Sequence, residues 1–205
     1  RGFSYHNEAK LDMRMDQNQD LSAYEIINEY ELDELTYIFR TYGEEKYAYS
    51  IAKNIIKNRP IKTTTQLVDI IKSSMPVKAT LAKHPAKKVF QAIRIAVNDE
   101  INILENTFLD AISLLKPGGR IAVISFHSLE DRITKQLFKK LSTIDPLVAG
   151  LPNIPKEYEP TLKLIGKYKA TELEITNNNR ARSAILRVAE KRWSRWKLER
   201  KKVTS

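Results

Sequence analysis

One short run of residues, Arg120-Ile-Ala-Val-Ile-Ser-Phe126, constrains the fold of this chain more than any other. The run is apolar and rich in β-branched residues, and it follows the stop signal Lys116-Pro-Gly-Gly119, so it predicts a buried strand. Directly after it, His127-Ser-Leu-Glu-Asp-Arg132 begins a helix, with Ser128 and Asp131 at the spacing of a capping box. A buried strand that leads straight into a helix is typical of an open α/β sheet.

The other strand patterns all lie downstream of this helix. Thr161 to Ile165 and Ser183 to Val188 are the two further candidates, whereas residues 20–115 carry helix signals alone. Capping boxes begin helices at Ser22 and Thr63, and a break is expected near Asn98-Asp99. Because an open sheet needs several strands before this point, we predict an α/β fold that holds only the latter part of its sheet. The helical block then reads as an insertion, and the first half of the sheet is expected upstream of Arg1.

The composition excludes several classes of protein. A chain of 205 residues with 42% apolar and 29% charged residues is typical of a globular protein. It has no cysteine, which removes disulfides and thiolate metal sites and suits a reducing cytosol. Its histidines, His6, His84 and His127, lack the spacing of metal ligands, and no apolar run approaches the roughly 18 residues of a membrane helix. We therefore expect a cytoplasmic protein without a metal.

The net charge of +10 is unevenly distributed. Residues 1–60 hold 8 basic and 11 acidic residues, residues 61–140 hold 13 and 7, and residues 141–205 hold 14 and 7. A basic remainder behind an acidic head indicates a polyanionic partner, with nucleic acid as the first candidate, or else a solvated basic surface. No Gly-x-Gly-x-x-Gly turn occurs, and glycines adjoin only at Gly118-Gly119, so the chain offers no recognisable cradle for a nucleotide cofactor.

Five blocks of the sequence resemble one known family. They are Arg1-Gly-Phe-Ser-Tyr5 with Leu11-Asp-Met-Arg-Met-Asp16, then Tyr42-Gly-Glu-Glu45, His84-Pro-Ala-Lys-Lys-Val-Phe-Gln-Ala-Ile-Arg-Ile-Ala-Val-Asn-Asp-Glu100, Gly118-Gly-Arg-Ile-Ala-Val-Ile-Ser-Phe-His-Ser-Leu-Glu-Asp-Arg132, and Asn178-Asn-Arg-Ala-Arg-Ser-Ala184. In this order they resemble the C-terminal portion of the bacterial 16S rRNA (cytosine-N4)-methyltransferases, the RsmH or MraW family. Lys10 stands where that family often has proline, and Ile101 where leucine is usual.

The resemblance implies a fold and an activity. It implies the C-terminal half of a class I (Rossmann-like) methyltransferase sheet with an all-helical insertion that helps to recognise substrate. It further implies transfer of a methyl group from S-adenosylmethionine to N4 of a cytidine in the decoding region of 16S rRNA, within the small ribosomal subunit. The family's cofactor-binding motifs precede Arg1, so we expect the catalytic residues upstream and an isolated chain that is inactive.

By role, we expect four parts of the chain. Residues 1–19 form a connecting segment that borders the cofactor cleft, with Phe3, Tyr5 and Arg14 at the border. The alternation of apolar and charged residues in this segment is equally explained by packing. Residues 20–80 form the helical insertion, residues 81–190 the C-terminal part of the methyltransferase domain, and residues 191–205 a basic tail with Trp193 and Trp196. The two tryptophans either stack on RNA bases or belong to a partly ordered amphipathic end.

Candidate residues for the substrate pocket or for RNA binding come from three places. His127 and Ser128 follow the strand, where open α/β sheets bind ligands, although a histidine that only caps the helix fits as well. Glu130 and Asp131 are expected to serve the helix N-terminus rather than to act as a base. The basic and amide candidates are Asn179, Arg180 and Arg182 before the last strand, and Lys87, Lys88 and Arg94, with Lys83, near a helix start. Arg94 has Asp99 or Asp12 as alternative ion-pair partners.

Two other readings stay open from the sequence. One is a non-enzymatic RNA-binding module that uses the basic surface, and a weaker one is a structural helical adaptor. A truncated sheet leaves an unpaired strand edge, which predicts a homodimer or a strand-exchanged dimer. The exact nucleotide, the oligomeric state and the origin of the truncation are not given by the sequence.

Overall fold

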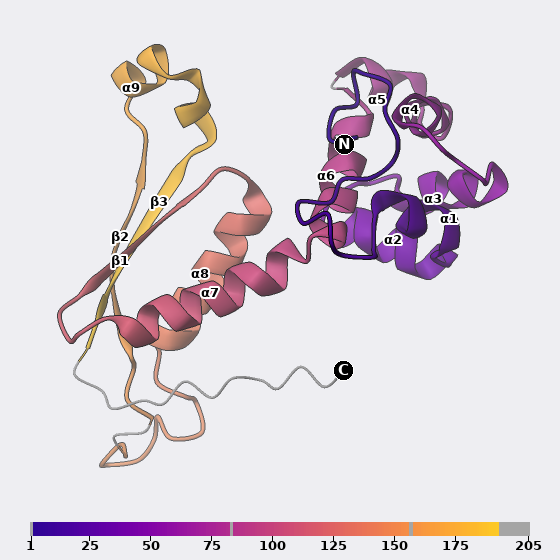
Figure 1. The fold of residues 1–205 in the computed structure, drawn as a ribbon. Coiled ribbons are helices and arrows are strands. Elements are labelled where there is room, and N and C mark those ends of the chain that lie inside the picture. The colour runs from indigo at the N-terminus through magenta and orange to yellow at the C-terminus, as the bar shows by residue number, and fades with distance from the viewer. Residues whose placement is uncertain (1, 83, 156–157, 193–205) are drawn as a thin grey trace. The chain divides into compact units, whose positions relative to one another are not determined.

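A computed structural model describes residues 2–82, 84–155 and 158–192, and the chain divides into two compact units, residues 1–100 and residues 101–205 (Figure 1). Lys83, Trp193 and Trp196, which the sequence analysis placed in basic or RNA-binding roles, lie outside the described residues. None of the helices described is both long and apolar enough to cross a membrane. Each unit has its own hydrophobic core.

The first unit is helical. Its elements are α1 (Ala23–Glu29), α2 (Leu32–Thr41), α3 (Ala48–Lys57), α4 (Thr64–Ser73), α5 (Val77–Ala82) and α6 (Ala86–Val97). The predicted capping boxes at Ser22 and Thr63 are confirmed, with Glu25 and Gln66 as the reciprocal partners. The predicted break is also confirmed, because α6 ends at Val97 and the next helix begins at Glu100.

One core closes this helical unit. Its largest fully buried side chains come from α1 to α4 and α6, among them Phe39, Ile51 and Leu67. Leu11 and Met13 of the opening segment enter the same core, so this segment is part of the unit rather than a loose leader. Since α6 also packs there, the compact unit runs to Glu100. The division by role at residues 80 and 81 stays a prediction.

The second unit combines helices with a small sheet. Its elements are α7 (Glu100–Leu114), which begins at the last residue of the first unit, β1 (Arg120–Ser125), α8 (Ser128–Ser142), β2 (Leu162–Lys169), α9 (Glu172–Asn177), a short 3₁₀ helix (Asn179–Ser183) and β3 (Ile185–Lys191). The predicted strand after the Gly-Gly turn forms as β1, and the two downstream strands are confirmed. The prediction that β1 is buried is wrong, because Ser125 alone among its residues is buried. The strand order is β1-β3-β2, with β3 antiparallel to both neighbours.

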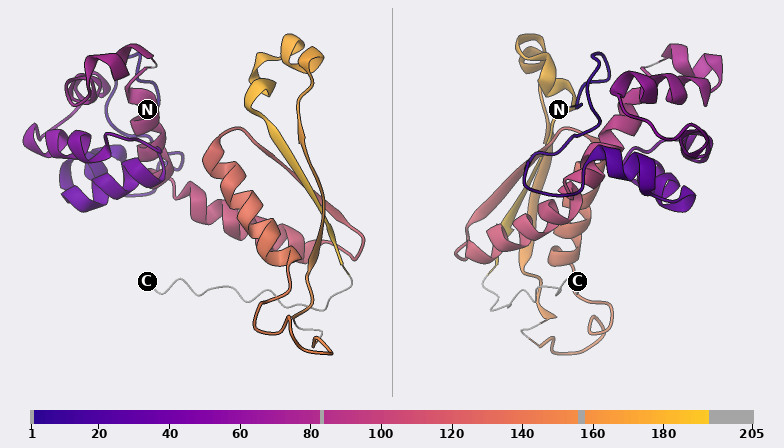
Figure 2. Two further views of the ribbon diagram at one scale, coloured as in Figure 1. Left: turned by 180° about the vertical axis from the view of Figure 1, so that it is seen from behind. Right: turned by 45° about the vertical axis from the view of Figure 1, so that its right-hand side comes forward.

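Helices α7 and α8 cover one face of this sheet (Figure 2). Phe108, Ile112 and Phe138 of the helices pack with Leu162 and Ala189 of the strands. Arg187, whose side chain reaches α8, lies on the same face. Side chains that face the helices alternate along β1 and β3 with side chains that face away, as the pleat requires. In β2 this alternation is interrupted between Leu164 and Gly166, where the register shifts.

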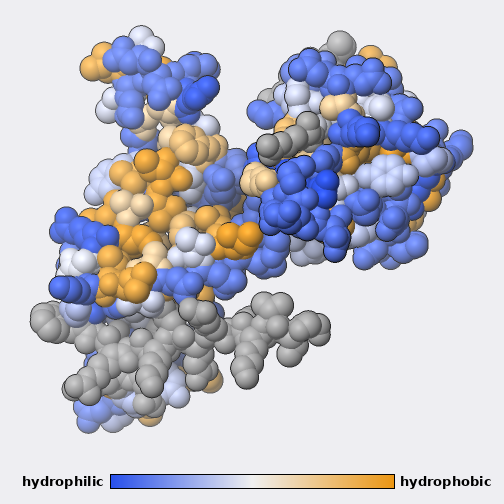
Figure 3. Space-filling view, viewed as in Figure 1, coloured by the Kyte–Doolittle hydropathy of each residue, from blue (hydrophilic) through white to orange (hydrophobic). Residues whose placement is uncertain are grey.

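The opposite face of the sheet is apolar and open. The pairing register aligns Ile124, Leu186 and Tyr168 in one row across the three strands. Ile124 is 57% exposed and Tyr168 is 50% exposed, and Figure 3 shows apolar side chains gathered over the strands of this unit. An antiparallel sheet often leaves one face in solvent, but that face is then usually polar, so an exposed apolar row is the outstanding irregularity of the fold.

Candidate functional site

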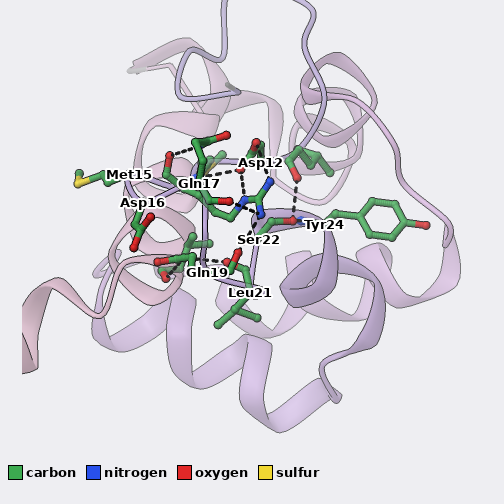
Figure 4. A network of polar contacts seen from close by, with 12 residues as sticks. Asp12, Met15, Asp16, Gln17, Gln19, Leu21, Ser22 and Tyr24 are labelled. Atoms are coloured by element: carbon green, nitrogen blue, oxygen red, sulfur yellow. Dashed lines mark hydrogen bonds and ion pairs between the residues drawn. The ribbon is translucent and has the colours of Figure 1, made fainter.

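Arg14 holds the opening segment of the helical unit through a network of polar contacts that includes Asp12, Gln17 and Gln19 (Figure 4). Its Nε donates to Oδ1 of Asp12 over 2.7 Å, and its guanidinium also donates to the carbonyl oxygens of Gln17 and Gln19. The ion pair holds the pKa of Asp12 below its usual value. The sequence analysis placed Arg14 at the border of a cofactor cleft, but its guanidinium is engaged in shaping this loop.

A buried asparagine fixes the same loop to the end of α6. Oδ1 of Asn98 accepts from the backbone N–H of Met15 over 2.7 Å, and its Nδ2 donates to the carbonyl of Met13 over 2.8 Å. Gln19 adds a hydrogen bond from Nε2 to the carbonyl of Val97 over 2.9 Å. Met13 is fully buried with a positive φ of 58°, a conformation that the surrounding bonds must maintain.

These contacts leave the tip of the loop, Met15 and Asp16, exposed to solvent. Met15 is 57% exposed, and Figure 4 shows its side chain pointing away from the polar network. Asp16 beside it is exposed and accepts a hydrogen bond from the N–H of Asn18 with one carboxylate oxygen. A rigid loop with an exposed thioether and a carboxylate at its tip suits contact with a ligand, whereas Leu11, Met13 and Arg14 serve the structure.

Phe3 and Tyr5 begin this segment. Phe3 is 39% exposed, while Tyr5 is half-buried and stacks on His84 with ring centroids 4.2 Å apart. Tyr5 also meets the edge of Phe90 at 5.8 Å. Nδ1 of His84 is buried and has no hydrogen-bond partner in the part of the chain that the structure describes, and burial lowers the pKa of its imidazole. Tyr5 therefore has a packing role, and only the ring of Phe3 is freely presented.

The junction between β1 and α8 is closed by its own residues. His127 is the N-cap of α8, and its Nδ1 accepts from the N–H of Glu130 over 3.4 Å. Its Nε2 lies 3.0 Å from Oε1 of Glu130. The imidazole contact and the N–H of Phe126, 2.8 Å away, hold the pKa of Glu130 at about 2.

The predicted capping box at Ser128 and Asp131 is therefore wrong by one residue. The box is made by His127 and Glu130, while Ser128 is the first residue of the helix and is exposed. Asp131 instead forms a bidentate ion pair with Arg187 of β3, at 2.8 and 3.0 Å. Both side chains are largely buried, so the pair joins helix to sheet, and the arginine lowers the pKa of Asp131. An arginine inside the last apolar strand was the available signal for it.

The basic candidates differ in how free they are. Arg94 forms a bidentate pair with Glu100 at 2.7 and 2.9 Å, not with Asp12, which pairs with Arg14. Lys87 is exposed, and the exposed Lys88 donates from Nζ to the carbonyl of Glu44 over 2.7 Å. The remaining candidates lie together in the short 3₁₀ helix and are all exposed: Asn179, Arg180 and Arg182. Lys87 and the two arginines thus remain available to a polyanion.

Among the residues described, no three His, Asp or Glu side chains gather as a metal site. The candidates also do not converge within one unit. The loop tip, Phe3 and Lys87 belong to the helical unit, while His127, Arg180 and Arg182 belong to the sheet unit.

Comparison with known protein families matches nearly the whole chain to one family profile. The profile of the MraW methylase family covers residues 1–192, which include both units as far as they are described. A match of this extent cannot come from one shared motif, since it takes in the opening loop, the helical unit and the sheet unit. The chain belongs to the MraW methylase family of S-adenosylmethionine-dependent methyltransferases.

Proposed function

We propose that the chain is the C-terminal portion of an enzyme that methylates N4 of a cytidine in the decoding region of 16S rRNA, using S-adenosylmethionine. Membership of the MraW methylase family supports the reaction class. The net charge of +10, together with exposed Lys87, Arg180 and Arg182, supports a polyanionic substrate. The enzyme acts in the cytoplasm, where its ribosomal substrate is found.

The single observation that carries the fragment proposal is the half-covered sheet. Its open face holds the row Ile124, Leu186 and Tyr168, and β1 forms an edge with no partner strand among the described residues. Burying such a row stabilises a protein by about 1.5 to 3 kcal/mol per large side chain, so a complete domain does not leave it in water. Further strands and helices of a Rossmann-like sheet are the natural cover.

The described residues do not fit S-adenosylmethionine. The N-terminus of α8, where open sheets place a ligand, already holds the carboxylate of Glu130. In the glycine pair, the N–H of Gly118 donates to the carbonyl of Lys191 and that of Gly119 to the carbonyl of Lys116, both over 2.8 Å. These N–H groups already donate to carbonyls of the fold and are not available to a cofactor. We infer that the isolated chain does not bind S-adenosylmethionine and is inactive.

The reaction also requires groups that position the target base and bind the RNA, and this portion of the enzyme can supply them. Methyl transfer to N4 requires the amine in line with the sulfonium methyl, with its lone pair out of ring conjugation. The base must also leave its stack and enter a pocket with an apolar wall. Met15 and Phe3 are the exposed apolar groups on the opening segment that suit such a wall, and Arg180 and Arg182 suit the phosphates. The proton acceptor is expected among residues upstream of Arg1.

A second copy of the chain is a further proposed partner. The free edge of β1 invites a strand from another molecule, which gives a homodimer or a strand-exchanged dimer of the 205-residue chain. Light scattering at increasing concentration tests it, and a clean monomer contradicts it.

Calorimetry and a methyl-transfer assay on small ribosomal subunits test the main proposal. The 205-residue chain is compared with a protein that also carries the residues encoded upstream of Arg1. We expect cofactor binding and transfer only for the longer protein. Tight binding of S-adenosylmethionine by the shorter chain contradicts the proposed division. RNA binding without transfer by the longer protein leaves a non-enzymatic RNA-binding module.

A further inference from the structure

A hollow of about 350 Å³ opens on the helical unit, and nothing above assigns it a role. It lies between the opening segment, the start of α1 and the residues that precede α4. The side chains that matter to its chemistry are Lys10, Asp12, Arg14, Ser22, Tyr24 and Lys62. Its volume suits one nucleotide rather than a whole macromolecular surface.

The backbone around the hollow is firmly held. An antiparallel bridge joins Lys10 to Thr63, and the N–H of Leu11 donates to the carbonyl of Lys62 over 3.4 Å. Gly2 packs against this bridge with a φ of 73°, and a Cβ there would collide with the carbonyl oxygen of Lys10. Two lysines that lie 52 positions apart in the sequence thus both line the hollow.

The charges in the hollow are not balanced. Asp12 and Arg14 neutralise each other through their ion pair. In residues 2–82, 84–155 and 158–192, no carboxylate forms an ion pair with Lys10 or Lys62, and both side chains are exposed. The lining therefore carries two ammonium groups without an ion-pair partner, while the carboxylate of Glu25 is hydrogen-bonded to Ser22 beside it. The remaining positive charge favours an anion and disfavours the sulfonium of the methyl donor.

An aromatic ring completes the lining. Tyr24 is 36% exposed, and Figure 4 shows its ring extending away from the polar network of the loop. It stacks on no other aromatic ring of the described residues. The hydroxyl of Ser22, in contrast, is hydrogen-bonded to Glu25 and to the carbonyl of Leu11. The ring of Tyr24 is therefore the lining group that is best placed to contact a base.

We propose that this hollow binds one nucleotide of single-stranded RNA, with its phosphate between Lys10 and Lys62 and its base against Tyr24. The combination of a cationic wall and a free aromatic face is the one that single-stranded nucleic acids require. The inference rests on the proposed function, because it takes RNA as the substrate. It adds a site on the helical unit that holds the strand flanking the target.

Salt-dependent binding of a short labelled oligocytidylate to the full chain tests this site. For single strands, each phosphate contact adds about 0.7 to the slope of log affinity against log salt. The double variant Lys10→Gln/Lys62→Gln should reduce the slope by about 0.7, because the two lysines share one phosphate. The control variant Lys46→Gln/Lys53→Gln removes two exposed lysines of the same unit and should leave the slope unchanged. Tyr24→Ala should weaken binding about tenfold, while Tyr24→Phe retains it.

The outcomes distinguish failure of the proposed nucleotide site from failure of the proposed methyltransferase function. Equal slopes for the two lysine pairs, with both variants as stable as the parent, overturn the site. Equal affinities for Tyr24→Ala and Tyr24→Phe overturn the stacking role. Methyl transfer by the longer protein is measured in parallel. Transfer that persists while the slopes are equal rejects the hollow alone, whereas absence of both RNA binding and transfer rejects the proposed function as well.

Discussion

The two units of the chain differ in how completely they bury their apolar residues. Among the described residues, twenty-two form the core of the helical unit, and seven form the core of the sheet unit. The helical unit encloses its core on all sides with α1 to α4 and α6. The sheet unit covers one face and leaves Ile124 and Tyr168 in solvent. The first unit therefore has a closed core, whereas the second leaves one apolar face exposed, which is what our proposal of further covering segments expects.

The largest expected effect concerns the complete core. Phe39→Ala should destabilise the helical unit by about 4 kcal/mol, because the ring is fully buried and its loss leaves a cavity. Denaturant unfolding followed by circular dichroism measures the loss. Tyr37→Ala on the same helix, whose ring is 58% exposed, is the control and should cost about 0.5 kcal/mol or less. Similar costs for both would contradict a closed core.

The next effect concerns how the sheet unit holds its covered face. Arg187→Ala should cost about 3 kcal/mol, since it leaves the carboxylate of Asp131 largely buried without its bidentate partner. A double-mutant cycle with Asp131→Ala measures the coupling. Additive losses would mean that the pair does not join α8 to β3. Arg120→Ala, at an exposed pair with Glu190, is the matched control.

A smaller effect concerns the loop that presents Met15. Asn98→Ala should cost about 2 kcal/mol, because the carbonyl of Met13 and the N–H of Met15 lose their partner. Faster hydrogen exchange at residues 12–16 should accompany it. Asn58→Ala, which removes an exposed amide at the end of α3, serves as the control. Unchanged exchange in the loop would show that Asn98 does not anchor it.

The smallest effect depends on pH. The pKa of Glu130 is lowered to about 2, so its carboxylate adds stability above its unfolded pKa, and that stability is lost as pH falls towards 2. The contribution is about 1 kcal/mol after solvent screening. The difference in unfolding temperature between the parent and Glu130→Gln should shrink as the pH falls from 4.5 to 2. Parallel pH profiles would contradict the role of Glu130 at the start of α8.

Local signals explain what could be predicted from the sequence. The caps at Ser22 and Thr63, the break after Val97 and the strand after Gly119 each depend on a few neighbouring residues. Ser128 and Asp131 had the same local signal and failed. Asp131 is drawn to Arg187, 56 residues away, and this leaves the cap to His127 and Glu130.

The candidate site was harder to predict for the same reason. An arginine in this position is a reasonable candidate for binding a ligand, yet three contacts of Arg14 lie within its own loop. Lys10 and Lys62 line one hollow because a bridge joins Lys10 to Thr63, and no spacing rule predicts such a contact between distant segments. A role for an exposed residue such as Met15 can be inferred only once the residues that fix its backbone are known.

Labelling of the open face tests the central claim most directly. The chain has no cysteine, so Ile124→Cys places a single thiol on the outer row, and Tyr49→Cys, 53% exposed on α3, supplies the control. The account predicts that a thiol reagent labels both positions in the 205-residue chain. In the protein extended upstream, it predicts that position 124 becomes protected while position 49 does not. Equal labelling of position 124 in the two proteins would contradict the account.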